Sequence, residues 1–434
     1  MKSKMIILFL SLAQLLFSQE LKLSYDELIN LTLENNLSIK TYQEKLNQAK
    51  LKEKEIFLGI LPQFKFTARY SRLSKIDPFV IQLPFVPGSP ELRVYEPVEK
   101  QTFSRVSVDF PLFTGLRQIN SIKAQRELVN ASEEELNQIK NEILFKSKEL
   151  YFKLFLAYKS LNLIEANIEY LEGQKKIAED FYKNGMIQKN DVLKIDIALT
   201  QAKVKFFDQQ NIINNLNLAL CQILNLDLNT KIFPLTEPDN YKLELIQEKS
   251  IETSKPEILA LKNLIKANEY LKRGTLGSLL PNLFFNAGYD YAKPNPKYFP
   301  VKNEWKYTWD VNLVLQFNLW DWLLPINRAN QIELQIKQSE YQLQQLIAKS
   351  KIEQNDLLNR MENEKNKINL FEKELEFAKE NERIVENKFK EGLSTSTDLL
   401  DANRQKIEAE IKLLESKINL ILLNEELKKH YGQY

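Results

Sequence analysis

The chain has very few residues of the kinds that bind metals or react covalently. Its 434 residues include one cysteine, Cys221, one histidine, His430, and four methionines. A disulfide requires two cysteines, and a structural zinc site requires about four Cys or His ligands. A disulfide and a Cys/His metal cluster within one chain are therefore excluded, and we expect no cofactor, no metal site, no catalytic residue and no enzyme activity.

Long apolar runs and an excess of charge are also lacking. The chain has 60 basic and 58 acidic residues, and Lys2 and Lys4 account for the difference. Without these two lysines the chain has no net charge, which argues against electrostatic binding of nucleic acid. The composition, 44% hydrophobic and 27% charged, is that of an ordinary globular protein. A membrane β-barrel has the same composition, because its strands alternate and never give a long apolar run.

The N-terminus has the form of a secretory signal peptide. Lys2 and Lys4 precede an apolar stretch, residues 5–17, and Ser18 follows it. The apolar stretch is too short for a membrane helix, and the residues after it are polar. We predict a signal peptide over residues 1–18.

Residues 304–319 alternate between apolar and polar side chains. This period of two predicts a strand longer than the ~5–6 residues usual in soluble sheets. Trp320 lies eleven positions after Trp309, a span of about 26 Å along the membrane normal for a strand tilted near 45°. A long strand of a soluble sandwich would alternate in the same way. Aromatic residues at both ends favour a membrane strand with an interfacial belt: Trp305, Tyr307, Trp309, Trp320 and Trp322.

Three other segments alternate in the same way, residues 63–72, 103–112 and 282–291. A proline-rich segment lies inside each pair of strands, residues 77–97 in the first half and 293–300 in the second. Because proline interrupts both ladders and helices, we predict long loops there, without strands or helices.

Most of the remaining chain is expected to be helical. Ser24 and Glu27 have the spacing of a capping box, so we predict a helix from Tyr25 to Ile60. Stretches without proline predict long helices, each followed by a return helix: 117–184 with 190–224, and 326–391 with 397–430. Residues 226–256 are expected to form an irregular linker. A heptad pattern indicates coiled-coil packing: Leu150, Leu154, Ala157, Leu161, Ile164, Ile168 and Leu171.

The sequence is internally duplicated. Gly185 and Gly392 are 207 residues apart, and the motifs at Phe110 and Phe317 share this offset. We therefore predict two structural repeats, residues 19–225 and 257–434, each made of a helix, two strands and a long helical hairpin. The fold class is mainly α with membrane β, with four transmembrane strands per chain. Four strands cannot close a barrel in lipid, so several chains must share one.

The order of these features resembles TolC-type outer-membrane efflux proteins over nearly the whole mature chain. The features are the leader, Asn35-Asn36, the Leu-Pro helix ends, the segment from Phe110 to Gly115 and the two glycine turns. The resemblance implies a homotrimer with a twelve-stranded α/β-barrel channel-tunnel in the outer membrane and its helices in the periplasm. It also implies a periplasmic adaptor (membrane fusion) protein and an inner-membrane transporter as partners, and passive export of small molecules or proteins in a tripartite efflux or type I secretion system.

The resemblance also implies functional residues at the far end of the helices. Asp398, Asp401 and Asp191 match acidic residues that narrow the periplasmic entrance. Asp191 and Asp398 would equally stabilise a helix N-terminus without any role in a pore. Ser394 stands where family members can carry an arginine that locks the closed tip.

The two glycine turns match the segments at which family members contact the adaptor, and the residues concerned are Gly185, Met186, Gly392 and Leu393. A helix-turn-helix connection needs a glycine for geometric reasons alone. An alternative function is that of a structural or adhesive coiled-coil protein at the cell surface or in the periplasm, in which the strands form a small soluble sheet and nothing is transported.

Overall fold

A computed structural model of the protein describes residues 20–75, 77–81, 92–95, 97–241, 250–299 and 301–434. The predicted signal peptide, residues 1–18, lies outside the described residues. The chain forms two compact units, and each takes segments from both sequence repeats. We call them the helical unit (up to Leu46, Ser132–Ala260 and Leu343–Tyr434) and the sheet unit (Asn47–Ala131 and Leu261–Gln342).

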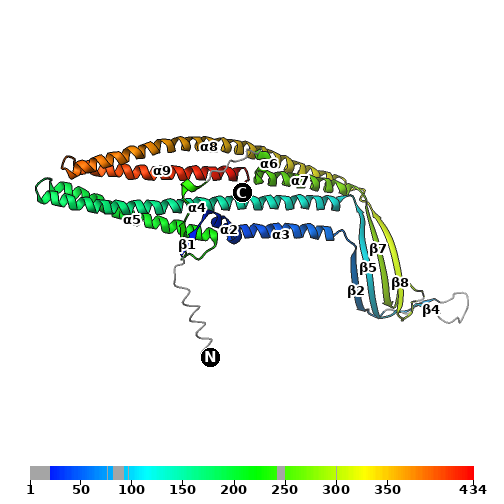
Figure 1. The fold of residues 1–434 in the computed structure, drawn as a ribbon. Helices are drawn as coiled ribbons and strands as arrows, with labels where there is room; N and C mark the ends of the chain where they lie inside the picture. Colours follow the sequence, from blue (N-terminus) through cyan, green and yellow to red (C-terminus); the bar gives the residue numbers. More distant parts are fainter. Residues whose placement is uncertain (1–19, 76, 82–91, 96, 242–249, 300) are drawn as a thin grey trace, which may run out of the picture. The chain divides into compact units, whose positions relative to one another are not determined.

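The sheet unit contains a four-stranded antiparallel sheet with the order β2-β5-β7-β8 (Figure 1). Its strands are β2 (Gln63–Arg72), β5 (Lys100–Thr114), β7 (Asn282–Lys293) and β8 (Lys306–Gln316). β8 is shorter than the predicted strand 304–319. Gln316 pairs with Asn282, the first residue of β7, so residues after Gln316 have no ladder partner on that strand.

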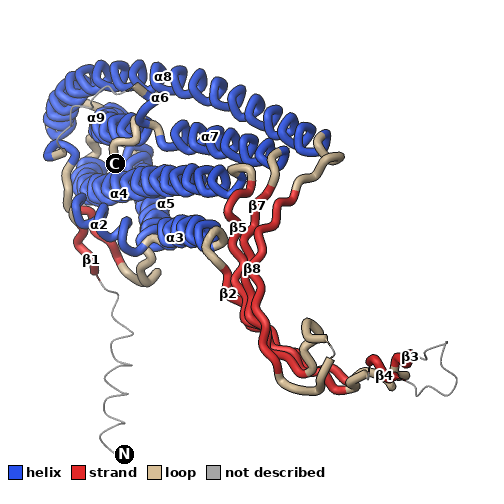
Figure 2. Tube along the Cα trace, turned by 90° about the vertical axis from the view of Figure 1, so that its right-hand side faces the viewer, coloured by secondary structure: helices blue, strands red, loops and turns tan. Residues whose placement is uncertain are grey.

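The proline-rich segment 77–97 contains two short strands, which corrects the expectation that no ladder forms there. β3 (Phe79–Ile81) pairs antiparallel with β4 (Leu92–Tyr95). All five prolines of this segment lie outside the two strands, so the ladder loses no N–H donor. Figure 2 draws this ribbon in red beyond the main sheet.

Long helical hairpins make up most of the helical unit. α4 (Arg117–Lys183) is followed by α5 (Lys189–Leu224), and α8 (Leu323–Lys390) is followed by α9 (Ser396–His430). At about 1.5 Å per residue, the 67-residue α4 is about 100 Å long. Leu150, Leu154 and Ala157 of the heptad pattern are buried in the core of this unit. Ile168 packs against a second buried cluster further along the hairpin.

The predicted helix from Tyr25 to Ile60 is interrupted at Asn36. α2 (Tyr25–Asn35) begins with the capping box of Ser24 and Glu27, as the sequence predicts. Asn36 then adopts an extended conformation (ψ 125°), and its side-chain oxygen accepts from the amide of Ser38 at the start of α3 (Leu37–Leu58). The Asn36 amide group also donates to the Ile223 carbonyl. The side chain therefore ends one helix and caps the next.

The predicted linker 226–256 is partly regular, which corrects the expectation of an irregular segment. β6 (Lys231–Pro234) pairs in parallel with β1 (Glu20–Leu23), and two short helices follow within the linker: η1 (Pro238–Asn240) and α6 (Ile251–Ser254). α7 (Pro256–Leu276) begins at the last residue of the linker, where the second repeat was predicted to open with a helix. α7 ends in a 3-10 turn, η2 (Gly277–Leu279), before β7. The pairing of β1 with β6 joins residues about 200 positions apart, which local sequence patterns do not reveal.

A buried carboxylate, Glu425 of α9, connects helices of the helical unit. It pairs with Lys148 of α4 and with Lys428, whose Nζ lies 2.9 Å from Glu425 Oε1. The hydroxyl groups of Tyr241 and Tyr434 donate to the same carboxylate. Burial opposes ionisation, but Lys148 and the hydrogen bonds outweigh burial and lower the pKa of Glu425 to about 2. Glu425 is therefore charged in the folded protein.

The Tyr151 side chain holds the β1–β6 pair against α4. It is fully buried, and its hydroxyl donates to the Leu23 carbonyl at 2.8 Å. The same oxygen accepts from the amides of Leu235 and Thr236 at 3.1 and 3.0 Å. One side chain therefore hydrogen-bonds three backbone groups, of which the Leu23 carbonyl and the Leu235 amide also bond to each other at 3.0 Å.

We predict that Tyr151→Phe destabilises the fold by about 1–3 kcal/mol, because the Thr236 amide loses its partner and the Leu23 carbonyl and the Leu235 amide keep only the hydrogen bond between them. The measurement is urea unfolding of the protein in detergent. Tyr182→Phe is the matched control, since Tyr182 lies on the same helix with its side chain half exposed. Equal stability of the two variants would contradict the role of the Tyr151 hydroxyl.

Candidate functional site

The four-stranded sheet exposes its apolar face. The exposed fractions are 79% for Phe64, 71% for Trp309 and 66% for Leu313. Part of the opposite, polar face is covered: Asp290 is buried and pairs with Arg105, 2.8 Å away on β5. Lys65 and Asp109 form another ion pair on this face at 3.1 Å. A sheet folded in water buries its apolar face instead, so the burial pattern is inverted.

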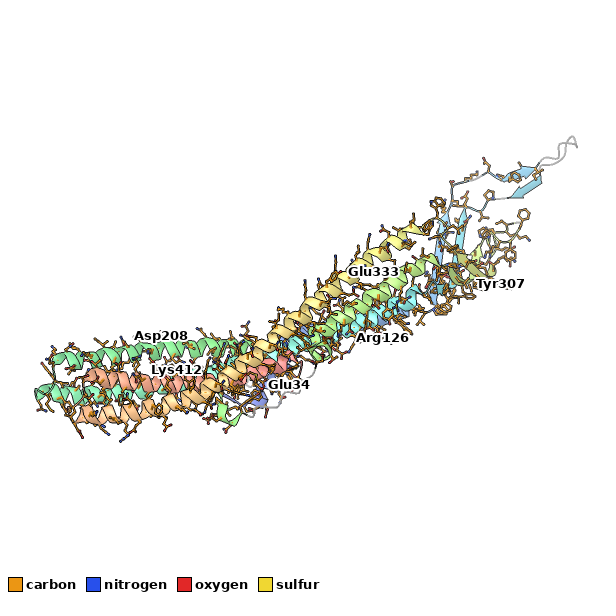
Figure 3. The ribbon with its side chains drawn as sticks, turned by 90° about the horizontal axis from the view of Figure 1, so that it is seen from above. Glu34, Arg126, Asp208, Tyr307, Glu333 and Lys412 are labelled. Atoms are coloured by element: carbon orange, nitrogen blue, oxygen red, sulfur yellow. The ribbon has the colours of Figure 1, made fainter. Side chains whose placement is uncertain are left out.

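Aromatic residues predicted as a membrane belt lie at both ends of β8. Trp305 stacks on Tyr291 with ring centroids 4.7 Å apart, and Tyr307, labelled in Figure 3, stacks on Tyr289 at 5.9 Å. Trp309 lies within the strand. Trp320 and Trp322 follow the end of the strand and are exposed. Their position at a membrane interface stays a prediction.

The two glycine turns have the same backbone conformation. Gly185 and Gly392 both have φ of +73°, in the left-handed region that favours glycine. The amide of the next residue, Met186 or Leu393, donates to the carbonyl five positions earlier, at 2.9 and 2.8 Å. This hydrogen bond closes a helix C-terminus in a Schellman motif. The equal geometry agrees with the duplication that the sequence indicates.

The turns lie side by side at the tip of the helical unit and carry exposed apolar side chains. A Cβ atom built on Gly392 would lie 3.5 Å from the Met186 Cε atom. Met186 is exposed, and 73% of Leu393 is accessible. Below them, Phe389 and Ile195 are buried in a small apolar cluster. The tip is therefore a firmly packed platform with two apolar side chains on its surface.

The structure places Asp398 in a capping box at the start of α9. Its carboxylate accepts from the amide and hydroxyl of Thr395, the N-cap residue, at 3.1 and 2.7 Å. These hydrogen bonds lower the pKa of the exposed Asp398 carboxyl group. The Ser394 hydroxyl donates to the same carboxylate at 3.3 Å. Asp398 thus supports its own helix and keeps its negative charge at neutral pH.

Asp401 and Asp191 each have a cation nearby, which sequence reasoning missed. Arg404 lies 3.2 Å from Asp401, one helical turn further along α9. Lys194 lies 3.4 Å from Asp191 in α5 and also donates to the Thr397 hydroxyl of α9 at 3.1 Å. The structure thus brings the first turns of both return helices together. Spacings of three residues in the sequence could have indicated both ion pairs.

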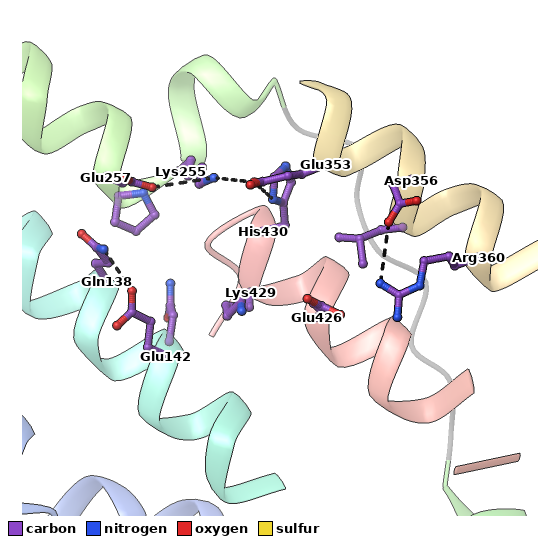
Figure 4. A pocket seen from close by; sticks show the side chains of 13 residues that line it. Gln138, Glu142, Lys255, Glu257, Glu353, Asp356, Arg360, Glu426, Lys429 and His430 are labelled. Atoms are coloured by element: carbon purple, nitrogen blue, oxygen red, sulfur yellow. Dashed lines mark hydrogen bonds and ion pairs between the residues drawn. The ribbon is translucent and has the colours of Figure 1, made fainter. Parts of the chain in front are cut away.

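A polar pocket of about 310 Å³ surrounds the single histidine of the chain (Figure 4). His430 Nε2 lies 2.9 Å from the Ser350 carbonyl oxygen, so this nitrogen carries the proton. Burial, followed by the nearby Lys255 ammonium, lowers the pKa of His430. Lys255 also approaches Glu353 and Glu257, at 3.5 and 3.8 Å. The pocket therefore contains a neutral imidazole within a network of ion pairs.

Within the part of the chain that the structure describes, no group of three or more His, Cys, Asp or Glu residues is arranged to hold a metal ion. Cys221 is buried, and burial raises the pKa of its thiol. Among the described helices, none has the length and apolar composition needed to cross a membrane.

Comparison with known proteins shows similarity of structure without similarity of sequence. No sequence-family model matches the chain. No curated protein sequence matches it either.

Solved structures match over nearly the whole chain. CusC, whose structures concern transmembrane channel formation, is 15% identical, with a TM-score of 0.80 over 94% of this chain and 92% of that chain. The CmeC outer membrane channel of Campylobacter jejuni is 16% identical (TM-score 0.77, 94% and 85% covered). The outer membrane protein VceC of Vibrio cholerae is 14% identical (TM-score 0.76, 94% and 96% covered).

At these identities the similarity defines the fold. The predicted resemblance to TolC-type proteins is confirmed at that level by these matches. The chain has the fold of the outer-membrane channels.

Proposed function

We propose that this protein is an outer-membrane channel-tunnel through which substrates leave the cell passively. The observation that carries the proposal is the inverted sheet, because a face with Phe64, Trp309 and Leu313 exposed is stable against lipid and unfavourable in water. Among the strands that the structure describes, the outer ones, β2 and β8, each have one edge without a partner strand. In lipid these edges must pair with other copies of the chain.

Three copies would supply twelve strands and enclose a lumen lined by the polar face, which carries Arg105 and Asp290. The fold of the matching channels supports this homotrimer. The helical unit would lie in the periplasm and meet a periplasmic adaptor protein and an inner-membrane transporter. Export of small molecules or proteins in a tripartite efflux or type I secretion system would then draw its energy from the transporter.

A structural or adhesive coiled-coil protein is the alternative function. The long hairpins would suit a spacer, but a spacer does not require a bare apolar face on its sheet. The alternatives differ in a direct measurement, since only the channel fractionates with the outer membrane and conducts ions across a planar bilayer. A soluble protein without conductance would contradict our proposal.

The two faces of β8 give a sharp test of membrane insertion. We predict that Leu313→Arg destabilises the inserted protein by about 2–4 kcal/mol, because an arginine would then face lipid near the bilayer centre. The adjacent Val314→Arg lies on the polar face and is expected to be tolerated. Urea unfolding from lipid vesicles measures both variants. Equal losses would show that the apolar face does not contact lipid.

The acidic residues at the tip give a test of the entrance. We predict that alanine at both Asp398 and Asp401 raises single-pore conductance in planar bilayers, because the constriction loses charge and side-chain volume. Thr395→Ala removes the helix cap and leaves both carboxylates. It therefore shows how much of any change in conductance comes from fraying of α9 rather than from loss of the carboxylates. Conductance equal to that of the wild type would show that these residues do not narrow the entrance.

The exposed apolar side chains of the turns give a test of adaptor contact. We predict that Met186→Glu combined with Leu393→Glu abolishes drug resistance in cells without lowering the amount of protein at the surface, because charges prevent apolar docking. The exchange Met186→Leu with Leu393→Met retains apolar surface and should preserve resistance. Full resistance of the glutamate variant would exclude contact at these positions.

A further inference from the structure

Four charged side chains form a closed network on the polar face of the sheet. Arg105 on β5 contacts Asp290 on β7 and Asp310 on β8, each at 2.8 Å. Lys297, from the connection between β7 and β8, contacts the same carboxylates at 2.9 and 3.0 Å. Each aspartate is thus shared by an arginine of the sheet and a lysine of the connection.

The Arg105 side chain reaches across β7 to β8, because β7 has a glycine, Gly288, at the crossing point. In the ladder, Asp310 pairs with Gly288, and Arg105 pairs with Asp290. A Cβ atom on Gly288 would lie 2.2 Å from Arg105 Nη2, which is shorter than any stable contact. Glycine at this position therefore leaves the space through which the guanidinium group reaches the far strand.

The connection between the strands folds back over the same polar face. Asn295 is buried, and its side-chain amide donates to the Lys306 carbonyl at 3.1 Å and to the Thr308 hydroxyl at 3.2 Å. Thr308 and Asp310 share one face of β8, because alternate residues of a strand point to the same side. Polar contacts at Asn295 and Lys297 therefore fix residues 294–299, which we call the strap, against the sheet.

The charges of this network balance within one chain. The side chain of Asp290 is 5% exposed and that of Lys297 is 47% exposed. The Asp290 carboxylate is therefore covered, and Lys297 is the most exposed side chain of the network, since Arg105 and Asp310 are each 24% exposed. Removal of the lysine charge would leave Arg105 against two aspartates, a net charge of about −1 in each chain at neutral pH.

We propose that the strap, held by Lys297, narrows the lumen and sets its ion selectivity. The inference rests on the proposed channel, in which the polar face lines the lumen. Several straps, one from each chain, would lie around one axis at the end where β7 turns into β8. Their lysine groups would border the path of a passing ion, where side-chain charge has its largest effect on selectivity.

The test uses the full-length protein in planar bilayers with a potassium chloride gradient. We expect Lys297→Met to raise single-channel conductance, because the strap loses its ion pairs, and to shift the reversal potential toward cations. Lys297→Arg retains a cation and should resemble the wild type. Lys302→Met removes a charge from the same connection but leaves the Lys297 ion pairs, so it serves as the matched control.

A double variant separates the size of the opening from its charge. Lys297→Met with Asp310→Asn restores the charge balance without restoring the strap, so conductance should stay high while the reversal potential returns to the wild-type value. Unchanged conductance of Lys297→Met, or an equal increase in conductance with Lys302→Met, would contradict the proposal that the strap narrows the lumen. Absence of conductance in the wild-type protein would instead overturn the proposed channel.

Discussion

The unpaired edges of the sheet are the constraint on which the rest of the molecule depends. Within the described residues, the four-stranded antiparallel sheet leaves one row of backbone N–H and C=O groups unpaired on β2 and another on β8. Water can satisfy such groups, but hydrocarbon cannot, and each unsatisfied group costs several kcal/mol there. Contact of the apolar face with lipid is favourable. A single four-stranded sheet in lipid is unfavourable, because the backbone groups at its two edges would have no hydrogen-bond partner. In the channel that we propose, association of several chains would resolve this conflict, so insertion and assembly are expected to be coupled.

Periodic patterns in the sequence were sufficient for the main elements. Alternation over residues 63–72 coincides with β2, and the absence of proline after Pro111 coincides with α4 and α5. These patterns are local, because they are formed by residues that are close together in the sequence. The mostly helical architecture could be derived in this way, and the similarity to solved outer-membrane channels agrees with it.

Features that depend on distant residues were missed or wrongly bounded. β8 ends at Gln316 because β7 begins opposite it, and the β1–β6 pair needs residues about 200 positions apart. Asn36 ends a helix through its own conformation and the capping it gives α3, and it also contacts Ile223. At the candidate site, the resemblance to TolC-type proteins pointed to Asp398, but its partner Thr395 was not predicted. Roles in a pore or in docking depend on other chains, which one sequence does not contain.

The single cysteine has a practical consequence for the study of assembly. Cys221 has no exposed surface and contacts the Thr230 carbonyl oxygen. Burial raises the pKa of its thiol, so little nucleophilic thiolate forms near neutral pH. A second cysteine introduced at a solvent-facing position would therefore react selectively with a spin label. Dipolar spectroscopy on such singly labelled chains would report the distances between protomers directly in native membranes.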